Sequence, residues 1–197
     1  MDPVDRGIDE RIVAAFEKIA QVSRILLWEA ASAEKLSPIQ LQFLLHIAGA
    51  TEELRRVGAI AKEFDLTPAT VSDALSTLES KGLITKGSSP GDRRSVVLSL
   101  TKKGRKTVKS VEGWKDAMVD AVSAFHGEQK EIVMAFMSGL IASLFERGIL
   151  STARMCSTCS NLVTVEDSNG PRFACGITGR RFDDSGVMIG CAAHAAR

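Results

Sequence analysis

The chain has 197 residues, of which 45% are hydrophobic and 25% are charged, and this composition excludes a globally disordered protein. No apolar run reaches the roughly 18 residues that a membrane span requires. The opening segment MDPVDRGIDERIV is too acidic for a secretory signal peptide, so we expect a cytoplasmic protein without a membrane partner. The net charge of +1 conceals two local features, a basic stretch and a cysteine cluster.

Apolar residues recur at helical spacing in the first third of the chain. They predict a long helix over residues 8–31 and a short one over 57–64. Between them, Ser37 and Pro38 have the N-cap and first-turn chemistry that begins a helix. The predicted apolar face of this middle helix consists of Leu41, Leu44, Leu45 and Ala48.

Thr67 and Pro68 begin a further helix, which is predicted to run to about Ser80 and to end at Gly82. Its inward face is predicted to be Val71, Leu75 and Leu78. Two short strands follow, over residues 83–86 and 96–100, and the polar segment 87–94 is predicted to form the turn between them.

Two more helices complete the helical part of the chain. Thr101 is expected to cap a helix whose apolar residues continue at helical spacing as far as Phe125. Gly127 interrupts this pattern, and a last, broadly apolar helix is predicted over residues 128–148.

Residues 80–110 contain nine Lys or Arg residues and one acidic residue, Asp92. Such a run is often only a solvated surface, but here it coincides with the predicted hairpin and the start of the following helix. Two short helices joined by a tight turn and followed by a hairpin form a winged helix-turn-helix. The second helix of such a pair fits the DNA major groove, which is about 12 Å wide, so we expect double-stranded DNA as the partner.

The segments LSPIQLQFLLHIA and VGAIAKEFDLTPATVSDALSTLESKGLITKGSSPGDRRSVVLSLTKKGRK resemble the MarR family of bacterial transcriptional regulators. This resemblance implies an obligate homodimer that binds a pseudo-palindromic operator, commonly as a repressor. It also implies an effector or redox input at the junction between the dimer helices and the winged domain. By the same resemblance, Arg94 or Arg93 would enter the minor groove, oriented by Asp92.

The predicted recognition helix has no Lys or Arg, unlike many members of that family. Asp73 either accepts a hydrogen bond from a cytosine amino group or faces a neighbouring arginine, and Ala69 and Thr70 offer methyl contacts to thymine. The predicted DNA-binding residues are Thr67, Ala69, Thr70, Ser72, Asp73, Ser76, Asp92, Arg93, Arg94 and Lys102.

All four cysteines lie in the last part of the chain, and clustered cysteines in a cytosolic protein indicate metal or redox chemistry. Cys156 and Cys159 form a C-x2-C pair, and Cys175 and Cys191 follow at wider spacing. Four thiolates suit a structural zinc ion, which would staple a segment too short for its own core. The alternatives are a zinc site in which His194 replaces one cysteine, an iron–sulfur cluster, and switching thiols.

We therefore expect a mainly α protein with a small β-wing, long N- and C-terminal dimerisation helices and a cysteine-rich metal-binding module. No catalytic constellation is recognisable, so we do not expect an enzyme. Two alternatives stay open: a redox-sensing regulator, and a metal-handling or electron-transfer protein whose winged helix binds no DNA. The expected segments are 1–35 for dimerisation, 36–106 for DNA binding, 107–150 for dimerisation and 151–197 for the cysteine module.

Overall fold

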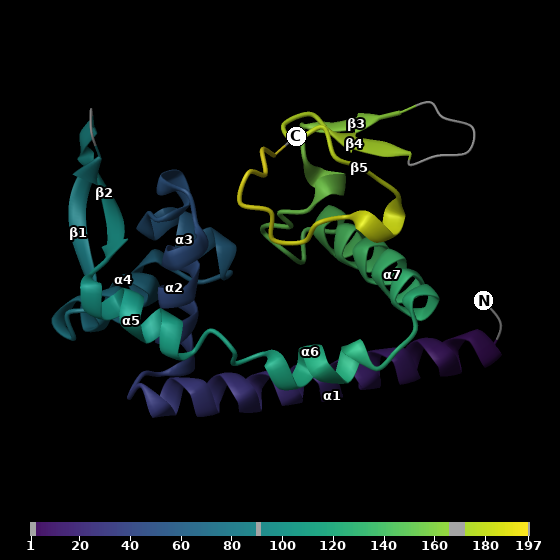
Figure 1. Cartoon of the computed structure of the whole chain (residues 1–197), viewed down its shortest axis with the longest axis horizontal. Helices are drawn as coiled ribbons and strands as arrows, with labels where there is room; N and C mark the ends of the chain where they lie inside the picture. Colours follow the sequence, from purple (N-terminus) through teal and green to yellow (C-terminus); the bar gives the residue numbers. More distant parts are fainter. Residues whose placement is uncertain (1–2, 90–91, 166–171, 197) are drawn as a thin grey trace.

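The computed structural model describes residues 3–89, 92–165 and 172–196, without the side chains of 3–6, 88–89 and 92–95. These residues form a mainly helical fold with a two-stranded hairpin and a separate three-stranded sheet. Figure 1 shows a winged helix-turn-helix at one end, long helices along the base, and a small C-terminal module above α7. None of the helices in the described ranges combines the length and hydropathy that crossing a bilayer would require.

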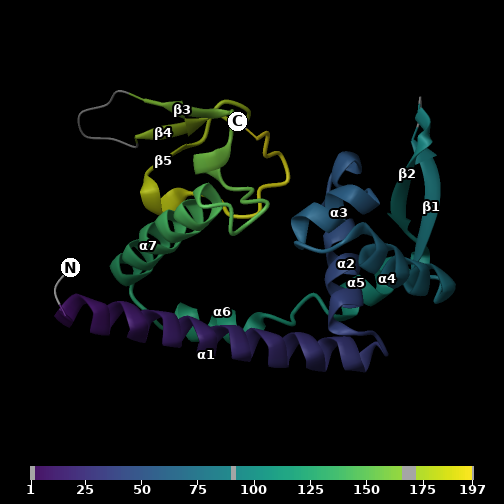
Figure 2. The same cartoon turned by 180° about the vertical axis from the view of Figure 1, so that it is seen from behind.

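Helix α1 (Pro3–Ala33) forms the base of the molecule together with the short helix α6 (Asp116–Ser123). Helix α7 (Gly127–Glu146) rises from this base toward the C-terminal module (Figure 1). In both Figure 1 and Figure 2, α6 runs beside α1. The rings of Phe16 on α1 and Phe136 on α7 stack with their centroids 6.3 Å apart. The helix predicted over residues 8–31 is confirmed and extends further at both ends.

The winged helix-turn-helix has the predicted order of elements. It consists of α2 (Pro38–Gly49), η1 (Glu52–Leu54), α3 (Val57–Glu63), α4 (Pro68–Ser80), β1 (Ile84–Ser89), β2 (Asp92–Leu100) and α5 (Lys102–Ser110). The strands β1 and β2 pair antiparallel, with Ile84 opposite Leu100. The predicted fold class is therefore confirmed for this region.

The predicted helix starts and stops are confirmed where local chemistry decides them. Ser37 forms a capping box with Gln40, and the hydroxyl of Thr67 accepts from the backbone N–H of Thr70 at 3.2 Å. At the end of α4, Gly82 has a φ of +69°, which glycine tolerates without strain. The N–H of Leu83 then bonds the carbonyl of Leu78 at 3.0 Å, which completes a Schellman turn.

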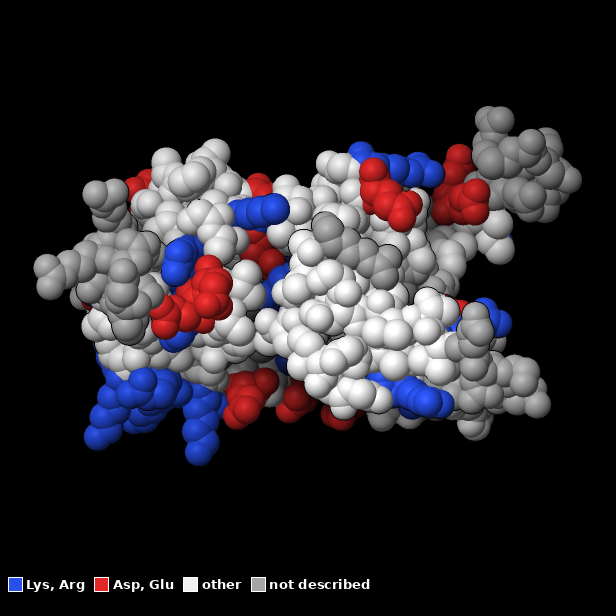
Figure 3. Space-filling view, turned by 90° about the horizontal axis from the view of Figure 1, so that it is seen from above, with Lys and Arg blue, Asp and Glu red and all other residues white. Residues whose placement is uncertain are grey.

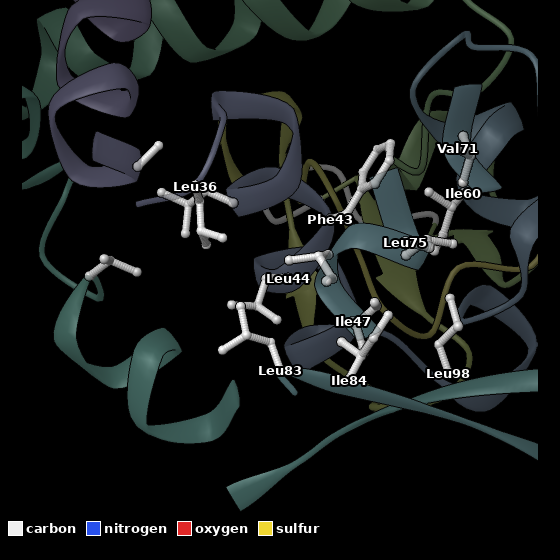
Figure 4. Packing of buried hydrophobic residues seen from close by; sticks show 14 of the residues in the cluster. Leu36, Phe43, Leu44, Ile47, Ile60, Val71, Leu75, Leu83, Ile84 and Leu98 are labelled. Atoms are coloured by element: carbon white, nitrogen blue, oxygen red, sulfur yellow. The ribbon is translucent and has the colours of Figure 1, made fainter. Parts of the chain in front are cut away.

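One hydrophobic core unites α2, α3, α4 and the hairpin (Figure 4). Val71, Leu75 and Leu78 are buried, as predicted for α4. The prediction of the buried face of α2 was partly wrong. Phe43 and Ile47 are buried beside Leu41 and Leu44, whereas Leu45 is only partly buried and Ala48 is exposed. Helix α2 packs against α1, α4, α5 and β2, so its buried stripe is wider than the sequence period indicated.

The single helix predicted from Thr101 to Phe125 was wrong, because the chain turns at residues 111–115 between α5 and α6. Val111 is buried in the winged-helix core and Trp114 packs against it. The backbone N–H of Trp114 bonds the carbonyl of Val111 at 3.1 Å, and that of Asp116 bonds Gly113 at 3.0 Å. Core packing and a mid-helix glycine, which weakens a helix, together outweigh the continuous periodicity.

The wing strands are longer than predicted, because β1 and β2 include most of the segment 87–94 that was expected to be turn. The pairing shifts register between Ser88 and Ser89. The hairpin projects away from the helices in Figure 1. Backbone pairing continues into this segment, so the strands extend beyond the apolar pattern that was used for the prediction.

The C-terminal module contains η2 (Cys156–Thr158), β3 (Leu162–Thr164), β4 (Phe173–Cys175), β5 (Arg181–Phe182) and η3 (Asp184–Gly186). Strand β4 lies between β3 and β5 in an antiparallel sheet. Met155 is fully buried and Phe182 is nearly so, which gives the module a core of very few residues. The segment η3 packs against α7.

Candidate functional site

Helix α4 has one buried face and one exposed polar face. Its exposed side chains include the small or short ones of Ala69, Thr70, Ser72, Asp73 and Ser76. Thr67, which precedes them, is also exposed and caps the helix. The predicted outward face is therefore observed, and its contact with DNA stays a prediction. Among the described side chains, Asp73 forms no ion pair with an arginine.

For the wing residues predicted to bind DNA, the structure describes the backbone but not the side chains. The backbones of Asp92, Arg93 and Arg94 lie in β2, but their side chains are outside the described part of the chain. Lys102, in the first turn of α5, is exposed. The Thr101 hydroxyl joins α5 to the start of the wing, because it accepts from the N–H of Gly104 at 3.0 Å and donates to the carbonyl of Gly82 at 2.7 Å.

The basic residues of α5 are all exposed, and two of them also bind the backbone of the winged core. Lys103 donates to the carbonyl of Lys81 at 2.8 Å, and Arg105 donates to that of Leu100 at 2.7 Å. Lys102 and Lys106 lie one helical turn apart on one face, and Lys109 follows on the same face. The prediction named Lys102 and missed Lys106, which this spacing would have identified. Figure 3 shows Lys and Arg side chains projecting from the winged-helix end.

A second group of exposed side chains, on α1, α6 and α7, is apolar; we call it the apolar face. It includes large hydrophobic side chains that are 43% to 65% exposed. They are Ile8, Val13, Ile19, Val22, Ile25 and Trp28 on α1, Val119 and Val122 on α6, Phe125 after it, and Ile132, Val133 and Phe136 on α7. An apolar surface of this extent on three helices indicates an interaction site.

His46 is not part of either surface. Its Nε2 atom is 3.0 Å from the carbonyl oxygen of Leu54, and its ring packs edge-on against Phe64 with centroids 5.6 Å apart. This partly buried position agrees with a structural role for His46.

The four cysteines and His194 all line one cavity of about 70 Å³ in the C-terminal module. Residues far apart in sequence meet here because three chain pairings converge. Leu162 pairs with Cys175 across β3 and β4, Met155 bridges to Ile189, and Cys159 bridges to Ala196. None of the four cysteines forms a disulfide.

Hydrogen-bond donors surround the sulfur atoms. The N–H of Met188 is 3.3 Å from Cys156 Sγ, and the Asn161 amide nitrogen is 3.8 Å from Cys159 Sγ. Hydrogen bonds from the Thr178 hydroxyl, and then from the backbone N–H groups of Thr178 and Ile177, hold the pKa of the Cys175 thiol below its usual value. Such donors stabilise thiolate, the form that binds metal.

The four thiols have the chemistry of a metal site and line one cavity, but they are not arranged as a ligand set. Within the described residues, no three His, Cys, Asp or Glu side chains are already arranged to hold an ion. His194 Nε2 is 3.0 Å from the Thr158 hydroxyl. That hydroxyl also bonds the carbonyls of Ala153 and Met155. His194 is thus engaged in supporting the loop that carries Cys156 and Cys159.

Comparison with known proteins finds a family match for the winged helix-turn-helix. Residues 35–95 match the model of the MarR family. Transcriptional regulator ZitR of Lactococcus lactis is 27% identical over 137 residues, which span 68% of this chain and 92% of ZitR.

Two solved structures have the same fold with a TM-score of 0.59 and 25% identity. The Staphylococcus aureus MepR–DNA complex aligns over 67% of this chain and 97% of MepR. Streptococcus pneumoniae FabT in complex with DNA aligns over 72% of this chain and 97% of FabT. These relatives are matched almost entirely, whereas roughly a third of this chain lies outside each match. The comparisons support a winged-helix regulator rather than an enzyme.

Proposed function

We propose that this chain is a MarR-family transcriptional regulator that binds double-stranded operator DNA as a homodimer. The observation that carries the proposal is the exposed polar face of α4, which lies in the same domain as the wing and the exposed lysines of α5. The likeness to MepR and FabT, both described in complex with DNA, supports it.

In this function, α4 enters the major groove and its short side chains approach base edges. Thr70 and Ala69 offer methyl groups to thymine, and the Asp73 carboxylate accepts from a cytosine amino group. Arg93 and Arg94 of the wing enter the minor groove, whose negative potential favours arginine. Lys102 and Lys106 contact phosphates, and each such contact releases condensed counterions. Because α4 carries no Lys or Arg, the electrostatic part of the DNA affinity comes from the wing and α5. This part depends strongly on the salt concentration.

The apolar face is the proposed homodimer interface. A second copy, related by a two-fold axis, covers the hydrophobic side chains of α1, α6 and α7. In such a dimer, the same surface of both subunits forms the interface. Each winged helix then contacts one half of a pseudo-palindromic site. Repression follows from occlusion of the promoter, and an effector acts by changing the separation of the two α4 helices.

We further propose that Cys156, Cys159, Cys175 and Cys191 hold one zinc ion per subunit. Their shared cavity and the donors around their sulfur atoms support this assignment. When bound, zinc would crosslink the four thiolates of a module whose apolar core is very small. The chain's own residues orient the site: Thr158 and His194 brace the C-x2-C loop, and β4 positions Cys175 beside Leu162.

The test of DNA binding uses duplexes that the full-length protein itself selects from a random-sequence pool. Mobility-shift titrations should show tight, salt-dependent binding by the wild type. The variant Arg93→Ala/Arg94→Ala should bind more weakly, with a salt slope shallower by about one or two units. The matched control Lys18→Ala/Arg147→Ala removes two exposed cations from outside the proposed DNA interface, neither of them among the apolar-face residues, and should bind as the wild type does. Equal affinity for the wing variant at near-physiological salt would remove the wing from the mechanism.

The metal assignment is tested on protein purified without oxygen. Elemental analysis should give one zinc per chain and a colourless solution. A visible absorption band with bound iron would replace zinc by an iron–sulfur cluster. Absence of both metals would leave switching thiols as the function of the cysteines.

A further inference from the structure

Helix α3 of the winged domain is in direct contact with the segment that leads into the cysteine module. Glu63, the last residue of α3, accepts a hydrogen bond from the Thr152 hydroxyl at 3.2 Å. The same carboxylate oxygen lies 3.3 Å from Nε of Arg154, which is an ion-pair distance without hydrogen-bond geometry. The side chains of Arg154 and Glu63 are only 14% and 21% exposed, so this charge pair is largely withdrawn from water.

Arg154 is held in turn by the cysteine module. Its backbone carbonyl accepts from the N–H of Cys191 at 2.9 Å. The next residue, Met155, is fully buried and pairs with Ile189. The N–H of Cys156 then bonds the carbonyl of Met188 at 3.2 Å. One short stretch of chain therefore touches α3 on one side and two of the four cysteines on the other.

Helix α3 is packed against the recognition helix. Ile60 and Ala61 of α3 are buried in the same core as Val71 and Leu75 of α4. Because a close-packed interior is hardly compressible and transmits strain, a shift at the end of α3 would strain its packing against α4. Around the Glu63–Arg154 pair, η1, α3, α7 and the module line a cavity of about 480 Å³. Close to the pair, the module and α3 are separated by open space, which leaves room for movement.

We infer that Glu63 and Arg154 couple the state of the cysteine site to the winged helix of the same subunit. This inference rests on the proposed function, because it makes the metal site a regulator of DNA binding. When the thiols are bound to metal, residues 152–156 are held and Arg154 stays on Glu63. When the site is empty or oxidised, this anchor loosens, the half-buried carboxylate loses its partner, and α3 and α4 are free to shift. Duplex binding then has to restore the order, so affinity falls.

The experiment compares full-length protein loaded with Zn²⁺ and protein stripped by a chelator under reducing conditions. The probe is a duplex selected from a random pool by the zinc-loaded wild type. Removing zinc should weaken wild-type binding by about tenfold, within the usual range of allosteric couplings. In Glu63→Gln and in Arg154→Gln, the ratio of the zinc-loaded to the stripped affinity should fall to near one, with zinc content unchanged. Glu53→Gln, an exposed carboxylate on neighbouring η1, is the matched control and should keep the wild-type ratio.

A second measurement does not need DNA. Amide hydrogen exchange of α3 should increase when zinc is removed, and also in Cys159→Ser, which disrupts the site whether or not zinc is its natural occupant. In Glu63→Gln, the α3 amides should already exchange at the faster rate in the zinc-loaded state.

The outcomes separate this coupling from the functions on which it rests. If no duplex is bound, the DNA-binding proposal fails, and hydrogen exchange alone decides the coupling. If no zinc is bound, hydrogen exchange of α3 in Cys159→Ser decides whether the coupling exists. The coupling is overturned if the wild type and the Glu63 and Arg154 variants lose the same affinity on stripping. It is equally overturned if α3 exchange is unchanged by stripping and by Cys159→Ser.

Discussion

Gly104 of α5 lies directly against the backbone of Leu83, the residue before β1. A Cβ atom built at Gly104 would overlap the carbonyl oxygen of Leu83 and stand 3.0 Å from its carbonyl carbon. The same carbonyl accepts from the backbone N–H of Thr101 at 3.0 Å. The start of the wing and the first turn of α5 are thus joined at a contact that admits no side chain.

Gly104→Ala should therefore destabilise the winged domain, although alanine is the better helix former. Overlap with a fixed backbone atom forces α5 away from the wing, and such overpacking costs about 1–3 kcal/mol. Thermal or urea unfolding measures the loss. Gly58→Ala on α3, where nothing lies within 4 Å of the added Cβ, is the control and should be neutral or slightly stabilising. Equal stability of the two variants would contradict the close approach.

The exposed lysines of α5 should contribute to DNA affinity without affecting the fold. Lys102→Gln/Lys106→Gln removes two proposed phosphate contacts, so the slope of log affinity against log salt should decrease by about two. The loss should be similar for every duplex sequence, because phosphates carry no sequence information. Titrations at several salt concentrations measure the slope. The proposed phosphate contacts are contradicted if Lys18→Gln/Arg147→Gln lowers the salt slope equally, since that pair lies outside the proposed DNA interface.

The apolar face should govern the oligomeric state. Ile132 on α7 is 65% exposed in the single chain, so Ile132→Glu should leave the monomer fold intact but place a charge in the proposed interface. Sedimentation velocity should then show monomers where the wild type sediments as a dimer, and operator binding should be lost with dimerisation. Val163→Glu alters an equally apolar residue of β3 that is 49% exposed and should remain dimeric. A dimer that tolerates Ile132→Glu would place the interface elsewhere.

Zinc content should distinguish the cysteines from His194. Because His194 is engaged with Thr158, His194→Ala should retain one zinc per chain, with a modest loss of module stability. Cys191→Ser should lose the ion. Metal analysis after gel filtration gives both results, and circular dichroism reports whether the helices persist. Loss of zinc in His194→Ala would instead favour the site of three cysteines and one histidine.

The winged domain could be predicted because its boundaries are set by local chemistry. Ser37, Thr67 and Thr101 each cap a helix through an amide three residues away, and Gly82 ends one through its own backbone freedom. The two faces of α4 follow from a helical period within a single element. These features involve residues that are neighbours in the chain, so the sequence determines them by itself.

Other features depend on what each segment packs against, and only the tertiary structure decided them. The turn after Val111 exists because Val111 and Trp114 pack on the winged core, which outweighs a continuous helical pattern. The convergence of four cysteines on one cavity requires the pairing of β3 with β4 and of Met155 with Ile189. Glu63 and Arg154 carry no signal of each other in the sequence, because their contact depends on the segment before the module reaching the end of α3. Local hydrogen bonds can be inferred from adjacent residues, whereas contacts between distant segments depend on how the whole chain minimises its exposed apolar surface.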